Sequence, residues 1–87
     1  MKKLRFSNEI IDEFTEEELN ALLVTKHNSK TLKILVIDGG NREIEGIFSE
    51  NGQLYAVLKD FEITNEREII FIHSSSINYS CFTTRNI

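Results

Sequence analysis

The interval between apolar residues changes near residue 30, and this change divides the chain into two patterns. Before it, Leu19, Leu22 and Leu23 recur at intervals of three and four, as on one face of a helix. After it, apolar and polar residues alternate, as in strands with one buried face. The sequence therefore predicts a helical segment over residues 1–30 and a sheet over residues 31–84.

The helix has a complete start signal. Thr15 is the expected N-cap, and Glu18, three residues later, completes a capping box. Phe14 and Leu19 form the expected hydrophobic staple across the cap. We expect the helix to end over residues 26–28, where asparagine can adopt a left-handed C-cap conformation.

The sheet is predicted to contain five short antiparallel strands joined by turn-forming residues. They span residues 31–38, 43–49, 53–61, 68–73 and 77–83. Ahead of the helix, residues 4–6 predict a further short strand and residues 8–13 a short helical turn. No repeat or linker divides the 87 residues, so we expect a single domain.

Alternation defines two faces on each of the first two of the five strands, and glycines indicate where the chain turns or bends. Asn51-Gly52 predicts a type I′ hairpin, because that turn needs positive φ at both central positions. A glycine inside the second strand lets it bend across the core, and short twisted strands then close on themselves. The fold class is therefore α+β, mainly β, with a small SH3-like barrel plugged by the helix. Leu32, Ile34 and Val36 share one face of the first strand, and Ile44, Gly46 and Phe48 share the expected inner face of the second.

Charge and composition narrow the range of functions. The net charge of −4 and the pI of about 5.1 argue against a general DNA-coating protein. A single cysteine, Cys81, excludes an internal disulfide, and we expect it to be a small buried hydrophobe. The longest apolar run, residues 34–37, is too short to span a membrane, and the start of the chain does not resemble a signal peptide. We expect a cytoplasmic protein, and the abundance of Lys, Asn, Ile and Glu suggests a bacterial or phage source.

Catalytic and metal-binding patterns are not visible. Ser74, Ser75 and Ser76 follow His73 directly, but a catalytic triad is defined by geometry and not by adjacency. Two histidines and one cysteine do not complete a usual zinc set. We expect no enzymatic activity, no cofactor and no metal.

The strand and turn pattern resembles Sm and Sm-like proteins, including the bacterial Sm-like RNA chaperone. The segments Leu35-Val36-Ile37-Asp38-Gly39, Glu45-Gly46-Ile47 and Tyr55 to Asp60 are similar to the first Sm motif. The segment Ile70 to Ile77 is similar to the second. A looser resemblance is to the YolD-like family of small bacterial and phage proteins.

The resemblance implies an RNA- or nucleic-acid-binding module that assembles into a homo-oligomer. Tyr55 stands near the position of a base-holding Asn in the family, while His73 and Ser74 replace a basic residue and a Gly. Tyr55, His73 and Phe48 are the aromatic candidates for stacking on a base, although we expect Phe48 in the core. Assembly is expected through the edges of the strands over residues 68–73 and 77–83. The candidate nucleic-acid-binding residues are Glu50, Asn51, Gln53, Tyr55, His73, Ser74 and Ser75.

An acidic cluster at the start of the helix leaves a second interpretation open. Negative side chains favour the positive end of a helix dipole, so a solvated helix start explains the cluster. The alternative is a surface that docks on a basic protein, as in a phage or mobile-element regulator or inhibitor. The cluster comprises Asp12, Glu13, Glu16, Glu17 and Glu18, of which Glu16, Glu17 and Glu18 would carry the docking.

Overall fold

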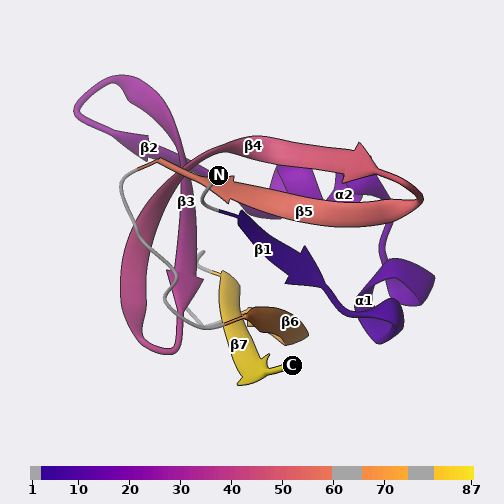
Figure 1. The fold of residues 1–87 in the computed structure, drawn as a ribbon. Coiled ribbons are helices and arrows are strands. Elements are labelled where there is room, and N and C mark those ends of the chain that lie inside the picture. The colour runs from indigo at the N-terminus through magenta and orange to yellow at the C-terminus, as the bar shows by residue number, and fades with distance from the viewer. Residues whose placement is uncertain (1–2, 60–65, 75–79) are drawn as a thin grey trace.

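Across the residues that the structure describes, the fold consists of a seven-stranded sheet and two short helices (Figure 1). The structure is a computed structural model that describes residues 3–59, 66–74 and 80–87. The end of the predicted strand over residues 53–61 and the start of the one over residues 77–83 lie outside the described residues, as does Ser75. The elements in chain order are β1 Lys3–Phe6, α1 Asn8–Glu13, α2 Glu16–Leu22, β2 Val24–His27, β3 Lys30–Ile37, β4 Gly40–Glu50, β5 Gln53–Leu58, β6 Arg67–Ser74 and β7 Ser80–Asn86.

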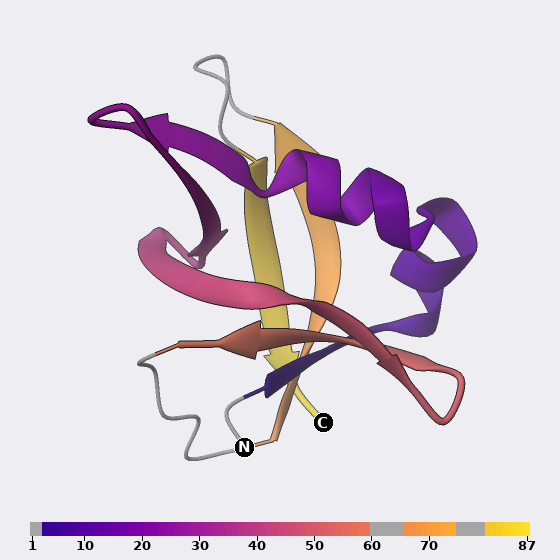
Figure 2. The same cartoon turned by 90° about the horizontal axis from the view of Figure 1, so that it is seen from above.

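The five predicted strands are present as β3 to β7, but the predicted sheet of five antiparallel strands is wrong. The strand order is β2-β3-β4-β5-β1-β6-β7, so β1 lies between β5 and β6. β3 also pairs with β7, and this pairing and that of β1 with β6 are parallel. In the segment before residue 30, the predicted short strand over residues 4–6 is present as β1 and the predicted helical turn over residues 8–13 as α1, whereas β2 was not predicted. Figure 2 shows the sheet curving around its core.

The start of α2 matches the prediction and its end does not. The Thr15 side chain accepts a hydrogen bond from the Glu18 backbone N–H, and the Glu18 carboxylate accepts one from the Thr15 N–H. The helix ends at Leu22 instead of over residues 26–28, and β2 follows. Asn28 has a positive φ of 48°, as expected, but as part of the β2–β3 hairpin turn and not as a helix cap.

The core-facing side of β3 is the one that carries Leu35 and Ile37. Leu35 is fully buried and Ile37 packs against the core, whereas Leu32, Ile34 and Val36 are half-exposed. Alternation alone fixes the two faces of a strand but not which of them is inside. Both faces of this strand carry apolar residues, so the difference in polarity that would identify the inner face is missing.

A β-bulge between Ile44 and Gly46 shifts the phase of β4. A bulge inserts one extra residue, so the alternation continues on the other parity beyond it. Ile44 and Ile47 are consequently both buried, at 4% and 5% exposure. Phe48 is 53% exposed, so its predicted place in the core is wrong.

Both helices lie against the same core that the strands enclose. Leu19 and Leu23 are fully buried and Ile10 nearly so, in one cluster with Leu35 and Phe82. Leu22, the third predicted core residue of the helix, is 36% exposed. The helices thus cover the interior of the curved sheet and leave its outer surface open.

Candidate nucleic-acid interface

The outer surface of the sheet carries exposed aromatic and basic side chains together, and we call it the outward face. Residues opposite one another in a ladder point to the same side of the sheet, so the strand register identifies its members. Tyr55 lies opposite both Phe48 and Arg5, and Arg5 lies opposite Glu68, which lies opposite Arg85. The outward face comprises Lys3, Arg5, Phe48, Tyr55, Glu68, Phe71, His73 and Arg85.

One end of this face holds Phe48 and Tyr55 beside a lysine. The Lys3 ammonium lies over the Tyr55 ring, with Nζ 4.2 Å from the ring centroid. The same Nζ donates a 3.0 Å hydrogen bond to Glu50 Oε2, which raises the pKa of Lys3. Lys3 therefore holds a positive charge beside two rings, one largely exposed and one half-buried.

A second aromatic pair lies on β6. The rings of Phe71 and His73 are 5.7 Å apart at an interplanar angle of 31°. Phe71 is 55% exposed, and His73 is exposed as well. Sequence analysis did not single out Phe71, because the run Ile69 to Ile72 is apolar throughout and gives no alternation. A bulge between Ile69 and Phe71 turns the latter outward while Ile69 stays fully buried.

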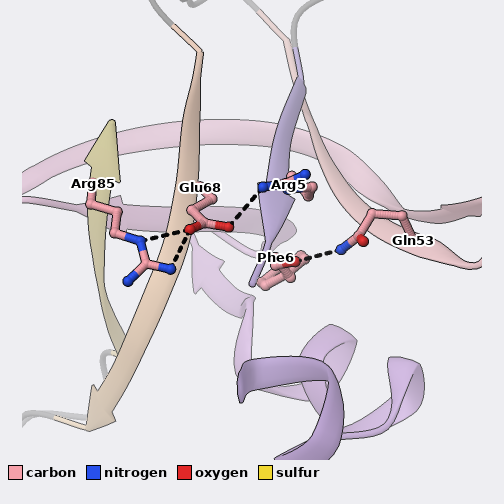
Figure 3. A network of polar contacts seen from close by, with 5 residues as sticks. All are labelled: Arg5, Phe6, Gln53, Glu68 and Arg85. Carbon is pink, nitrogen blue, oxygen red and sulfur yellow. Dashed lines mark hydrogen bonds and ion pairs between the residues drawn. The ribbon is translucent and has the colours of Figure 1, made fainter. Parts of the chain in front are cut away.

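The centre of the face is occupied by an ion-pair network that joins three strands (Figure 3). Arg85 Nε donates a 2.6 Å hydrogen bond to Glu68 Oε1, and Arg5 Nη2 donates a 3.0 Å bond to Oε2. Arg85 and then Arg5 hold the pKa of the Glu68 carboxyl below its ordinary value. The side chain of Glu68 is 9% exposed, against 36% for Arg5 and 51% for Arg85. The two guanidinium groups thus present an accessible positive surface over a buried carboxylate.

Two of the predicted binding residues at the β4–β5 turn already have partners within the protein, and the third forms the turn itself. Gln53 Nε2 donates a 2.6 Å hydrogen bond to the Phe6 carbonyl oxygen, which ties the turn to β1 (Figure 3). Glu50 pairs with Lys3. Asn51 occupies the turn itself with φ of 52°. The residues of this turn therefore have structural roles, and the Glu50 carboxylate would repel a phosphate.

The predicted site residues form two groups and not one. Tyr55, Arg5 and Glu68 share one row of the ladder, so Tyr55 lies about 10 Å from β6, two strands away. His73 lies five residues further along β6, a distance of about 15 Å. Ser74 ends β6 beside it. A ligand that contacts both Tyr55 and His73 must therefore extend along the sheet.

The acidic residues of the alternative interpretation lie on the helices. Glu16, Glu17 and Glu18 are exposed in the first turn of α2, and Glu18 closes the capping box. Asp12 and Glu13 are exposed at the end of α1. The cluster is thus fully solvated, and its capping role accounts for one of its members.

Other chemistry has little support among the residues described. No group of three or more His, Cys, Asp or Glu side chains in that part of the chain could hold a metal ion. Cys81 is half-buried and lies opposite His73 in the register. A small pocket beside Asp38 and Arg67 is lined by groups that bind one another, because Asp38 accepts hydrogen bonds from Arg67 and from the Thr84 hydroxyl. No helix within the described ranges is long and apolar enough to cross a membrane.

No known protein family, curated protein or solved structure matches the chain. The geometry of the outward face is therefore the basis for assigning a function.

Proposed function

We propose that the protein is a non-enzymatic module that binds single-stranded nucleic acid, RNA in particular, on the outward face. The observation that carries the proposal is the presence of exposed rings and cationic side chains on one sheet surface. Phe48 and Phe71 are more than half exposed. A partner that covers these rings removes their apolar surface from water, which favours binding. Unpaired bases stack on aromatic side chains and guanidinium planes, whereas Lys and Arg neutralise the phosphates.

The resemblance to Sm-like proteins agrees with this proposal. β3 pairs with both β4 and β7 in a seven-stranded sheet, so the strands do not form the expected five-stranded barrel, and the curved, mainly β sheet is the part that agrees with the resemblance. Within it, Tyr55 and His73 were expected near the ligand, and both belong to the outward face. Phe71 and Phe48 replace the turn residues Glu50 and Gln53 as the stronger candidates, since the latter pair have internal partners.

Fluorescence anisotropy with labelled 12-nucleotide oligo(U) and oligo(A) RNA tests the proposal. A stacking residue contributes about 1–3 kcal/mol per base, so Phe48→Ala and Phe71→Ala should each weaken binding about 5- to 150-fold. Leu22→Ala is the matched control, because Leu22 is a partly exposed apolar residue on α2, away from this face. Absence of binding at micromolar protein, or equal losses in all three variants, would exclude the proposed function.

Self-association requires a different route from the one predicted. β6 pairs with β1 and β7, and β7 pairs with β6 and β3, so neither is a free edge along its whole described length. β2 stands at the end of the strand order. We propose that any homo-oligomer forms through β2 or through the part of β6 beyond Ile69. Light scattering at several protein concentrations measures the oligomeric state.

Docking on a basic protein is the second candidate, favoured by the exposed carboxylates at the start of α2. Glu16→Lys/Glu17→Lys tests it without breaking the capping box, which uses Thr15 and Glu18. Loss of a captured basic protein with unchanged RNA binding would favour docking. Loss of RNA binding in Phe71→Ala with the acidic variant unaffected favours the nucleic-acid proposal.

A further inference from the structure

The charge of this acidic protein is unevenly distributed along the chain. Residues 19–37 contain Lys26, Lys30 and Lys33 but no Asp or Glu. The chain holds 10 Lys and Arg and 14 Asp and Glu in all, so the remaining residues carry 7 basic against 14 acidic side chains. A segment of charge +3 therefore belongs to a body of charge −7.

The positive segment coincides with the β2–β3 hairpin, which projects from the body of the protein. Figures 1 and 2 both place the tip of this hairpin at the opposite end of the molecule from the β4–β5 turn and the helix α1. Lys26, His27 and Lys30 are exposed, as are the turn residues Asn28 and Ser29.

The two exposed lysines point to opposite sides of the hairpin. Lys26 lies opposite Thr31, and Lys30 lies opposite His27, one position along. Since side chains alternate between the faces of a strand, Lys26 and Lys30 project from opposite faces of the hairpin. Lys33 has a different role, because its Nζ donates a 2.8 Å hydrogen bond to Asn20 Oδ1 and fastens the base of the hairpin to α2.

The hairpin continues from the row of the sheet that carries His73. His73 lies opposite Cys81, and Cys81 lies opposite Val36 on β3. From Val36, β3 runs back to Lys30 over six residues, or about 20 Å. A strand of nucleic acid stacked on Phe71 and His73 could cross β7 and follow β3 toward Lys30, which lies on the same face of β3 as Val36, and reach Lys26 around the tip of the hairpin.

We infer that the β2–β3 hairpin is a phosphate-binding arm, in which Lys26 and Lys30 contact the backbone of the single strand held on the outward face. The inference rests on the proposed function and adds a second, sequence-independent contact to it. Lysine is a mobile point charge suited to phosphates of variable position. The tip of the hairpin, residues 26–31, contains no apolar side chain, so it lacks the apolar anchors that a protein interface needs.

Lysines on an edge strand also discourage strand pairing, and the salt dependence of binding separates that role from phosphate contact. For single strands, the slope of log K against log salt is about 0.7 per phosphate neutralised. Lys26→Gln/Lys30→Gln should therefore lower the slope for 12-nucleotide oligo(U) by about 1.4. Its affinity should be roughly 25-fold weaker than wild type at 0.1 M salt and converge with it near 1 M.

Lys59→Gln is the matched control for the single variant Lys30→Gln. It removes the same charge from an exposed site beside Glu43, outside the hairpin. We expect a slope change of about 0.7 for Lys30→Gln and none for Lys59→Gln. Circular dichroism verifies that the exposed substitutions leave the fold intact.

The outcomes distinguish this inference from the proposed function. RNA binding by the wild type with an unchanged slope in the double variant overturns the phosphate-binding arm alone. No RNA binding by the wild type overturns both proposals. An oligoglutamate peptide serves as the acidic-protein probe: if the double variant loses that peptide but keeps its RNA slope, the hairpin binds acidic protein segments and the inference is wrong.

Discussion

The β4–β5 and β2–β3 hairpins share one turn geometry and differ in almost everything else. Both turns have two central residues at positive φ, 52° and 76° at Asn51-Gly52 and 48° and 65° at Asn28-Ser29. The β4–β5 hairpin buries residues from both strands, whereas β2 contains no buried residue. A turn sequence thus determines where the chain reverses, and burial determines whether the hairpin stabilises the fold.

This difference assigns the two hairpins separate roles. The β4–β5 hairpin pairs with β1, and Gln53 bonds to the Phe6 carbonyl, so it belongs to the framework of the sheet. The β2–β3 hairpin is joined to the body at its base, where the Ile34 N–H donates to the Leu23 carbonyl. Its tip is free to meet a ligand at little cost to stability.

Truncating one apolar residue in each hairpin should give the largest contrast. Ile47→Ala removes a side chain that is 5% exposed and should cost about 2–5 kcal/mol of unfolding free energy. Val24→Ala removes one that is 46% exposed and should cost about 0.5 kcal/mol or less. Urea unfolding followed by circular dichroism measures both, and equal losses would show that β2 also packs in the core.

Neutralising Glu68 should weaken the part of the sheet on which the β4–β5 hairpin rests. Glu68→Gln breaks charge-assisted hydrogen bonds to Arg5 and Arg85 and should cost about 1.5–3 kcal/mol at neutral pH. Glu43→Gln, at an exposed ion pair with Lys59, is the control and should cost under about 1 kcal/mol.

The pH dependence of this loss has a definite sign. The pKa of Glu68 is lower in the folded protein than its ordinary value of 4.5, because Arg85 and Arg5 favour the charged form. The stabilisation is therefore complete above the ordinary pKa and is lost as pH falls through the lower folded pKa. The free energies of unfolding of wild type and Glu68→Gln should converge as the pH falls below 4.5 and through the lower folded pKa, and a constant difference would contradict the network.

Substituting the glycine of the β4–β5 turn should have an intermediate effect. Gly52 has φ of 76°, and an added Cβ would meet no atom within 4 Å. Gly52→Ala should therefore cost about 1–2 kcal/mol through backbone strain alone. Gly52→Asn should recover part of this loss, because asparagine tolerates the left-handed region. A loss as large for Asn as for Ala in thermal unfolding would show that another contact is involved.

Relieving strain in the other turn should have the smallest and most local effect. Ser29 has φ of 65°, so Ser29→Gly should tighten the β2–β3 turn. Since β2 contains no buried residue, global stability should change by about 0.5 kcal/mol or less. Amide hydrogen exchange should slow at the hairpin residues alone, and slower exchange in the core would argue that the two regions are coupled.

The sequence predicted local structure better than the position of the elements in space. The capping box at Thr15 and the Asn51-Gly52 turn depend on neighbouring residues, and both are present. The insertion of β1 between β5 and β6 depends on long-range pairing, which no local pattern reveals. β2 was mistaken for the end of the helix because it lacks an apolar face.

The candidate site was predicted incompletely for the same reason, because local patterns do not reveal long-range pairing. Tyr55 and His73 were identified, but Phe48 was assigned to the core and Phe71 was overlooked. Each lies just beyond a β-bulge, where the alternation changes parity. Detecting these residues from sequence would require locating the bulges, and Gly46 was the single local hint of one.

The uneven charge gives the molecule an electric dipole, which favours one orientation in an electric field. Near a polyanion, the lysine-bearing tip is attracted and the carboxylate-rich helices are repelled, so encounter would occur tip first. Copies aligned in this way along one strand would all turn their acidic ends to the solvent, and mutual repulsion between those ends would limit how densely they coat it.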